Sequence, residues 1–416
     1  IIEECVFYKG NRQSMTEKAD RVLTHPVAGV PVFLCIMALV FFLTFTVGDA
    51  IKGWFEIGLD WAFEAVRTAL TALGASDWVC SLVVDGIMSG VGGILTFLPN
   101  IFILFLALAF LEDSGYMARV AYVMDGIMGK VGLSGKAFLP MVLGFGCTVP
   151  AVMASRTLEN EEDRKKTILL TPFMSCSARL PIYVLFASVF FGKYAMIVAF
   201  SLYALGLIVA ILLALIIGKV WKTDTKVPLL IELPDYKVPN PRTIRIYVWE
   251  KVKDYLTKAG TTIFVASIVI WFILNYNFQG MTSDVTTSFG AMIGKVLAPV
   301  LVPAGLGAWQ IVVALISGLS AKEVVISSFS VLYGVNNISS PEGMATLSGA
   351  LGAIGFGPLN AYALMVFCLL YTPCVATLAT IRKETHSTSW TLKMVVFQLL
   401  LAYVAAVLVF QIGSLF

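Results

Sequence analysis

The chain is 416 residues long, with 58% hydrophobic and 13% charged residues and a formal net charge of +3. A mean hydropathy of +0.88 excludes an ordinary soluble domain, which needs far less apolar surface. No basic stripe interleaved with aromatic residues lies outside the loops, so a nucleic-acid partner is excluded too. No HExxH motif or complete phosphate-binding loop occurs, which argues against an enzyme.

Long uncharged runs follow one another from residue 27 to the C-terminus. A hydrocarbon core of about 30 Å is crossed by roughly 20 helical residues, so most of these runs are long enough to span it. In lipid the backbone must satisfy its own hydrogen bonds, and no alternating strand pattern is present. The sequence therefore predicts an all-α, polytopic helical membrane protein with about eight spans and broken helices. The runs without Asp, Glu, Lys or Arg are 27–47, 86–111, 137–155, 194–217, 259–283, 296–321, 343–381 and 394–416, and the run 167–191 carries only Arg179.

The segments outside these runs predict a topology. Residues 1–24 lack the apolar core of a signal peptide and are expected to be a cytoplasmic connector from a missing upstream domain. Residues 53–73 have a helical period with one polar face, which predicts an external amphipathic helix on the membrane surface; a loop helix packed on the spans is the alternative. The segment 48–85 holds two basic and six acidic residues, whereas 219–258 holds nine basic and five acidic ones. By the positive-inside tendency, 219–258 is a cytoplasmic linker and 48–85 is external.

The linker divides the chain into a first membrane half, 25–218, and a second, 259–416. Each half contains a similar phrase: Cys147-Thr-Val-Pro-Ala-Val-Met-Ala-Ser-Arg156 in the first and Cys374-Val-Ala-Thr-Leu-Ala-Thr-Ile-Arg382 in the second. Transporters built from repeats show such weak internal symmetry, with the site at the repeat interface. We therefore expect one repeat in each half; chance similarity of Ala-, Val- and Leu-rich sequence is the alternative.

Three cysteines, Cys147, Cys176 and Cys374, each lie within four residues of a proline inside an apolar run. Glycine and proline interrupt the helical hydrogen-bond ladder, and in a membrane the freed backbone groups must face protein or a watery cavity. A thiol at such a break is expected to face that cavity, whereas a lone cysteine in a membrane helix is more often a packing residue. Thiolate favours transition metals over Mg²⁺ or Ca²⁺. The residues expected to break helices at the path are Gly144, Gly146, Pro150, Pro172 and Pro373.

Three acidic residues at the ends of uncharged runs are candidates to help a cation in or out. A charge within the bilayer costs at least about 2.5 kcal/mol, so such residues usually face an interior path or find a partner. Glu323 lies between two uncharged runs, while Glu112 and Asp113 follow the run 86–111 directly and would equally suit the water interface.

Several phrases resemble the membrane domain of the FeoB family of ferrous-iron transporters. In the first half they are Leu-Glu-Asp-Ser-Gly-Tyr-Met-Ala-Arg at 111–119, Gly-Phe-Gly-Cys-Thr-Val-Pro-Ala at 144–151 and Pro-Phe-Met-Ser-Cys-Ser-Ala-Arg-Leu-Pro-Ile-Tyr at 172–183. In the second half they are Gly-Leu-Ser-Ala-Lys-Glu-Val-Val at 318–325 and Tyr-Thr-Pro-Cys-Val-Ala-Thr at 371–377. The resemblance runs from about residue 25 to near the C-terminus.

This resemblance implies two gate-type repeats that frame an ion path, with Cys147, Cys176 and Cys374 as gate or coordinating residues. It implies a multi-pass protein of the bacterial inner membrane, with a cytoplasmic N-terminus, that imports Fe²⁺ as its transported substrate. GTP and Mg²⁺ would bind only in an N-terminal GTPase domain, which is absent from this sequence. The implied partners are the lipid bilayer, that GTPase domain, small FeoA- or FeoC-type accessory proteins, and further copies of the chain in a homo-oligomer.

Two other functions compete with Fe²⁺ transport. Gate-type repeats also occur in carriers of organic solutes such as nucleosides, and a thiol-lined path would also accept Mn²⁺ or Zn²⁺. A third possibility, which is not a transporter, is a membrane scaffold or receptor.

Overall fold

Helix follows helix throughout the computed structural model, which describes residues 20–25, 28–220, 236–282, 285–335, 338 and 340–415. Within these residues the only strands form the two-residue hairpin of β1 (Tyr276–Asn277) and β2 (Gly280–Met281). The all-α prediction is therefore confirmed. Most of the predicted connector 1–24 and residues 221–235 of the predicted linker lie outside the described residues.

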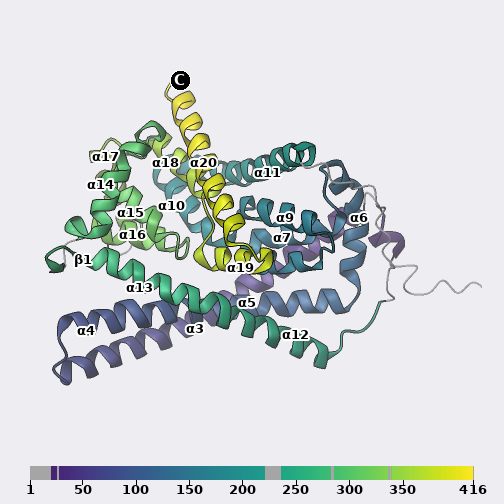
Figure 1. Cartoon of the computed structure of the whole chain (residues 1–416), viewed down its shortest axis with the longest axis horizontal. Helices are drawn as coiled ribbons and strands as arrows, with labels where there is room; N and C mark the ends of the chain where they lie inside the picture. Colours follow the sequence, from purple (N-terminus) through teal and green to yellow (C-terminus); the bar gives the residue numbers. More distant parts are fainter. Residues whose placement is uncertain are drawn as a thin grey trace, which may run out of the picture.

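The first half begins with a long helical hairpin. The 44-residue α3 packs along α5, and Figure 1 shows the two side by side at one edge of the molecule. The predicted external helix 53–73 is the second part of α3, continuous with the first span, and its location on a membrane surface stays a prediction. The helices of this half are α3 (Gly29–Ala72), α4 (Asp77–Ser81), a π-helical segment (Leu82–Met88), α5 (Ser89–Asp113), α6 (Tyr116–Lys130), α7 (Phe138–Gly146), α8 (Thr148–Ala154), α9 (Glu161–Leu170), α10 (Leu180–Phe191) and α11 (Ala195–Val220).

The second half begins after the linker with α12 and α13, joined by the π-helical segment Tyr255–Gly260. Further on, the stretches Phe289–Ala304 and Trp309–Ser317 meet at an angle of 102°, so this apolar run is sharply bent. The helices are α12 (Pro241–Asp254), α13 (Thr261–Asn275), α14 (Phe289–Leu301), α15 (Trp309–Ser317), α16 (Val324–Tyr333), α17 (Pro341–Ala353), α18 (Pro358–Leu370), α19 (Val375–Thr385) and α20 (Thr388–Gly413).

Five helical stretches of the described chain are long and apolar enough to cross a membrane, and the bent pair α14–α15 makes a sixth if it counts as one span. Shorter apolar helices lie among them, such as Phe264–Asn275 and Val324–Tyr333. Large apolar side chains point outward from α3, α11 and α20, for example Phe42 (64% exposed) and Phe200 (72% exposed). Apolar surface of this extent is typical of a chain whose solvent is lipid.

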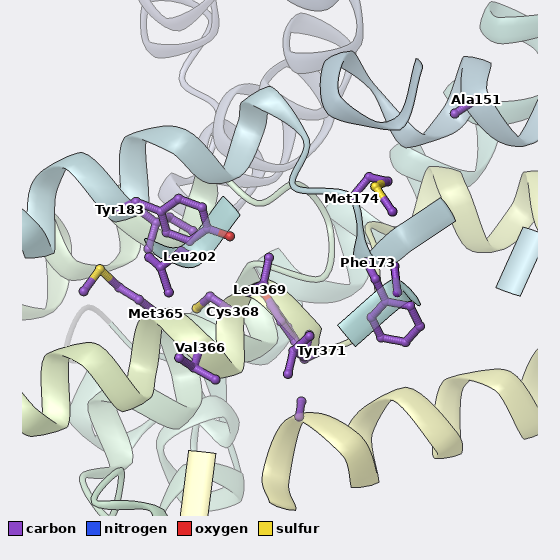
Figure 2. Packing of buried hydrophobic residues seen from close by; sticks show 14 of the residues in the cluster. Ala151, Phe173, Met174, Tyr183, Leu202, Met365, Val366, Cys368, Leu369 and Tyr371 are labelled. Carbon is purple, nitrogen blue, oxygen red and sulfur yellow. The ribbon is translucent and has the colours of Figure 1, made fainter. Parts of the chain in front are cut away.

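The core lies around α18, whose residues 363–370 are all buried. Figure 2 shows Tyr183 of α10 and Leu202 of α11 close to Met365 and Cys368 of α18. Helix α18 therefore packs against protein on all sides, whereas few residues of α20 beside it are buried.

The two halves share an order of elements. In the first, the broken pairs α7/α8 and α9/α10 precede the 26-residue α11; in the second, α15/α16 and α18/α19 precede the 26-residue α20. This order matches the break at Cys176 with the break at Cys374. The similar phrases in the sequence instead made Cys147 the counterpart of Cys374. The helices that carry those two phrases, α8 and α19, pack against each other.

Candidate functional site

The first helix break is centred on a cysteine. Helix α7 ends at Gly146 and α8 begins at Thr148, while Cys147 between them has extended backbone angles, φ −148° and ψ 130°. Pro150 lies in the first turn of α8. Backbone N–H groups there have no acceptor within the helix, so proline, which lacks this group, is tolerated. The chain therefore changes direction at the thiol itself.

Gly144 and Gly146, beside this break, are helical. Neighbouring side chains leave no room for a side chain at either position. A Cβ atom on Gly144 would lie 2.9 Å from the Cβ atom of Met174, and one on Gly146 would lie 2.7 Å from a ring carbon of Phe41. The break predicted over Gly144 and Gly146 thus falls one residue later, and the glycines instead let neighbouring segments approach α7 closely.

The second break separates α9 from α10. Pro172 lies in the short 3₁₀ turn Thr171–Phe173, and Cys176 has extended backbone angles, φ −73° and ψ 159°. The segment is anchored in the core, because Ser175 Oγ donates to Tyr183 Oη at 3.1 Å and both side chains are buried. Cys176 is therefore held on a rigid, non-helical stretch.

The second half has two corresponding breaks. Residues 318–323 separate α15 from α16, and residues 371–374 separate α18 from α19. In the latter, Pro373 precedes Cys374, which is extended (φ −62°, ψ 157°) and whose thiol lies 3.2 Å from the Thr377 hydroxyl. The positions predicted from Pro172 and Pro373 are those at which the helices are interrupted.

Hydrogen bonds tie the two breaks of each half together next to a cysteine. In the first half, Ser177 Oγ donates to the carbonyl of Gly146 at 2.9 Å, beside Cys147. In the second half, the Val375 N–H donates to the carbonyl of Leu319 at 2.8 Å, beside Cys374. Backbone groups freed by the breaks thus find partners across the breaks, as a membrane interior requires.

All four breaks line one cavity of about 640 Å³. The three predicted thiols face it from different helices, and Cys147, Cys176 and Cys374 are each partly exposed. The break residues in its wall are Gly146, Cys147, Thr148, Cys176, Ser177, Ala178, Arg179, Ser320, Ala321, Lys322, Glu323, Pro373 and Cys374.

Polar residues of the α3–α5 hairpin line the cavity as well. Asp49, Lys52 and Glu56 come from α3, and Asn100 of α5 donates from Nδ2 to Asp49 Oδ1 at 2.8 Å. Lys52 Nζ lies 3.8 Å from Glu56 Oε1. Sequence reasoning placed Asp49 and Glu56 in the external segment 48–85, Glu56 within the predicted amphipathic helix, and did not predict that they line this cavity. Their spacing of seven residues, with Lys52 between, puts them on one helical face and could have indicated it.

The three predicted acidic residues lie in two different parts of the structure. Glu323 lines the cavity, and its role in ion transfer stays a prediction. Glu112 and Asp113 do not; they end α5 near α12, where Asp113 Oδ2 accepts the Asn240 N–H at 2.7 Å. A contribution of Glu112 and Asp113 to ion transfer remains a prediction.

The thiols share a cavity without forming a closed coordination sphere. Among the described residues, no group of three or more His, Cys, Asp or Glu side chains is close enough to hold a metal ion. The donors available around the cavity are the three thiols, the hydroxyls of Thr148, Ser177 and Ser320, and the carboxylates of Asp49, Glu56 and Glu323. Sulfur and oxygen donors together suit a borderline cation such as Fe²⁺.

An ionic cluster lies next to the cavity, on the far side of Val149 and Tyr255. Arg156, which follows α8, donates from Nε to Glu384 Oε2 at 2.7 Å and from Nη2 to Glu384 Oε1. Its Nη1 lies 3.8 Å from Asp254 Oδ2. The cluster therefore joins both halves and α12 at one point.

Broken helices from two halves, converging within apolar spans on a cavity that thiols and charged side chains line, define a polytopic membrane protein of the transporter type. The Gate family model, described as nucleoside recognition, matches residues 94–190 and 256–388, and a model of the ferrous iron transport protein B C terminus matches residues 199–251. The chain belongs to the FeoB family and represents its membrane part.

Individual relatives agree with this assignment. An Fe(2+) transporter FeoB of Staphylococcus aureus is 42% identical over all of this chain, and one of Methanocaldococcus jannaschii is 41% identical over all of it. An Fe(2+) transport protein A/Fe(2+) transporter FeoB fusion protein of Porphyromonas gingivalis is 38% identical over 97% of this chain. The chain spans 62%, 61% and 52% of the lengths of these relatives. No solved structure matches the chain.

Proposed function

We propose that this chain forms a path for Fe²⁺ across the membrane and that Cys147, Cys176 and Cys374 lie on that path. The observation that carries the proposal is the convergence of four helix breaks, with these three thiols, on one cavity. The names of the FeoB relatives support Fe²⁺ as the transported substrate.

The arrangement of donors suits passage better than storage. An ion must bind well enough to shed water and weakly enough to leave. Carboxylates of Asp49, Glu56 and Glu323 would attract the hydrated ion, and the thiols would take over part of its coordination deeper in the cavity. Glu112 and Asp113, outside the cavity, would act where the ion leaves or arrives.

The chain acts as a transporter, and its control belongs to parts outside it. GTP and Mg²⁺ would bind in an N-terminal cytoplasmic GTPase domain of the full-length protein, in the bacterial inner membrane. An FeoA- or FeoC-type protein is a further proposed partner, and the fusion in Porphyromonas gingivalis supports the first of these. Assembly into a homo-oligomer is proposed on the family resemblance alone.

The test is Fe²⁺ flux into proteoliposomes, comparing the chain with a variant in which Cys147, Cys176 and Cys374 are all serine. Serine keeps a polar atom but is a poor ligand for a borderline metal, so we expect flux to fall by at least about tenfold while the variant still inserts. Full flux in the triple variant would remove the thiols from the mechanism, and no Fe²⁺ flux in the full-length protein with its proposed GTPase domain and GTP would remove the function.

A nucleoside carrier is the second candidate, favoured by the description of the Gate family. A cavity of about 640 Å³ is within the range that holds a small organic ligand. Uptake of labelled nucleosides, inhibited by unlabelled nucleosides and not by Fe²⁺, would favour this function. Flux assays with Mn²⁺ and Zn²⁺ decide whether other divalent metals share the path.

A further inference from the structure

An open groove of about 770 Å³ runs between α5 and α12 and shares no lining residue with the cavity of the thiols. The two helices lie side by side, as Figure 1 shows, and Val248 and Val252 of α12 pack against Ala109 of α5. Each helix contributes a row of apolar side chains at every fourth position, which is one helical face. The rows are Leu98, Phe102, Leu106 and Phe110 on α5 and Ile244, Val248 and Val252 on α12.

The groove has the depth of one leaflet of a bilayer. From Phe110 to Leu98 it follows about twelve residues of α5, or about 18 Å at a rise of 1.5 Å per residue. Half of a hydrocarbon core of about 30 Å is about 15 Å. The uncharged run 86–111 ends beside Phe110, so this end of the groove lies near the water interface. The apolar rows therefore match one acyl chain that starts at the interface.

Arg245 of α12 is the charged residue in the wall of this groove. Asn240, before it, contacts Asp113 at the end of α5, and Val248, after it, packs against Ala109. Arg245 lies between these two contacts along α12, and thus at the level of the last turn of α5. The guanidinium is therefore at the interfacial end of the groove, above the apolar rows.

The guanidinium of Arg245 has no acidic neighbour in the part of the chain that the structure describes. No carboxylate oxygen there lies within 4 Å of it. Asp113 accepts the Asn240 N–H, and neither Asp113 nor Glu250 lines the groove. A charge at the edge of the hydrocarbon region usually finds a partner, and the planar guanidinium suits phosphate oxygens. Basic pockets between membrane helices bind anionic head groups in this way.

We propose that the groove between α5 and α12 binds one anionic phospholipid, with its phosphate at Arg245 and one acyl chain along the apolar row of α5. The leaflet is the one on the side of the linker 219–258. A phospholipid carries an anion and an apolar chain at the spacing that the groove presents. A second copy of the chain would need a carboxylate next to an apolar ridge, and the lipid needs no such arrangement. The proposal is independent of which ion the chain carries.

The experiment offers equal amounts of phosphatidylglycerol and phosphatidylcholine to the purified protein in detergent and counts the retained lipids by native mass spectrometry. In Arg245→Gln we expect the preference for phosphatidylglycerol to fall about fivefold, because a basic residue near the membrane surface contributes about 1 kcal/mol. Arg382→Gln is the matched control: Arg382 is exposed and lies outside the groove, so the parent preference should remain. Leu106→Trp adds bulk to the apolar row and should lower the retention of both lipids.

An unchanged preference in Arg245→Gln would overturn the site. If this variant fails to insert, the parent protein decides through phosphatidylglycerol with a photoactivatable group in the acyl chain, its adducts located by peptide mass spectrometry. Adducts concentrated on 98–110 and 244–252 support the site. Adducts spread evenly over the exposed faces of α11 and α20 would show bulk lipid contact only and refute it. A dimer that Leu106→Trp dissolves, with no lipid retained by the parent, would assign the groove to a second copy instead. None of these results depends on Fe²⁺ flux, so the proposed function is tested separately.

Discussion

The two halves of the chain interrupt their helices in the same order but place different side chains at the breaks. Both breaks of the first half carry a cysteine that faces the cavity, Cys147 and Cys176. In the second half only the later break does, at Cys374, while the earlier break carries Lys322 and Glu323. Each half supplies one buried basic residue, Arg179 at the second break of the first half and Lys322 at the first break of the second half.

This difference shows that one set of residues determines where the helices break and another determines the chemistry of the cavity. Glycine, proline and the hydrogen bonds between breaks open the helices in both halves. The side chains at the opened positions then decide what the cavity binds, and they need not follow the repeat. Three thiols in a four-break cavity is an asymmetric result that a strict repeat would not produce.

The largest effect is expected from removing the thiols of one half at a time. If all three sulfurs act on one ion, Cys374→Ser alone should lower Fe²⁺ flux by about tenfold or more, as much as the double change of Cys147 and Cys176 to serine. Proteoliposome flux, normalised to inserted protein, measures both. Full flux in Cys374→Ser with loss in the double variant would place the thiol site in the first half alone.

The contact between the halves gives the next largest effect. Glu384 is 7% exposed, and Glu384→Gln leaves Arg156 without its closest carboxylate. Because Arg156 is 38% exposed and solvent screens it, we expect a loss of about 1 to 3 kcal/mol of stability, less than for a fully buried pair. Thermal unfolding in detergent measures the loss, with exposed Glu250→Gln as the matched control. Equal melting of both variants would mean that this cluster does not hold the halves together.

A pH effect is expected from a cluster that joins the first half to the connector before it and the linker after it. Arg119, on α6, donates from Nε and Nη2 to the Asp20 carboxylate at 2.8 and 3.2 Å, and Tyr236 donates to it at 2.9 Å. The hydrogen bond from Arg119 lowers the pKa of Asp20 below its usual 3.8. Its stabilisation is therefore present above about pH 4 and is lost as the pH falls further.

The variant Asp20→Asn should accordingly be less stable than the parent chain at neutral pH, and the gap should close in acid. Thermal unfolding of both proteins between pH 3 and pH 7, roughly the span over which an aspartate changes charge, tests this. A gap that stays constant with pH would show that the carboxylate charge contributes nothing.

The smallest effect is expected outside the breaks. Cys35 lies on the exposed face of α3 and does not line the cavity. Cys35→Ser should leave Fe²⁺ flux within about twofold of the parent, as surface substitutions usually do. A large loss of flux in this variant would contradict the distinction between the thiols that line the cavity and those that do not.

The sequence by itself determined the fold class, the helix breaks near Pro150, Pro172 and Pro373 and the thiols beside them, but it did not indicate the break at 318–323. These properties are local: hydropathy over some twenty residues predicts a span, and Pro172 and Pro373 each lack the backbone N–H that a continuous helix would use. Tertiary structure decided which residues share the cavity. It brought in Asp49, Glu56 and Lys322 and left out Glu112 and Asp113, because membership depends on which helices pack together and on which side each one faces, and uncharged runs of similar composition do not specify their neighbours.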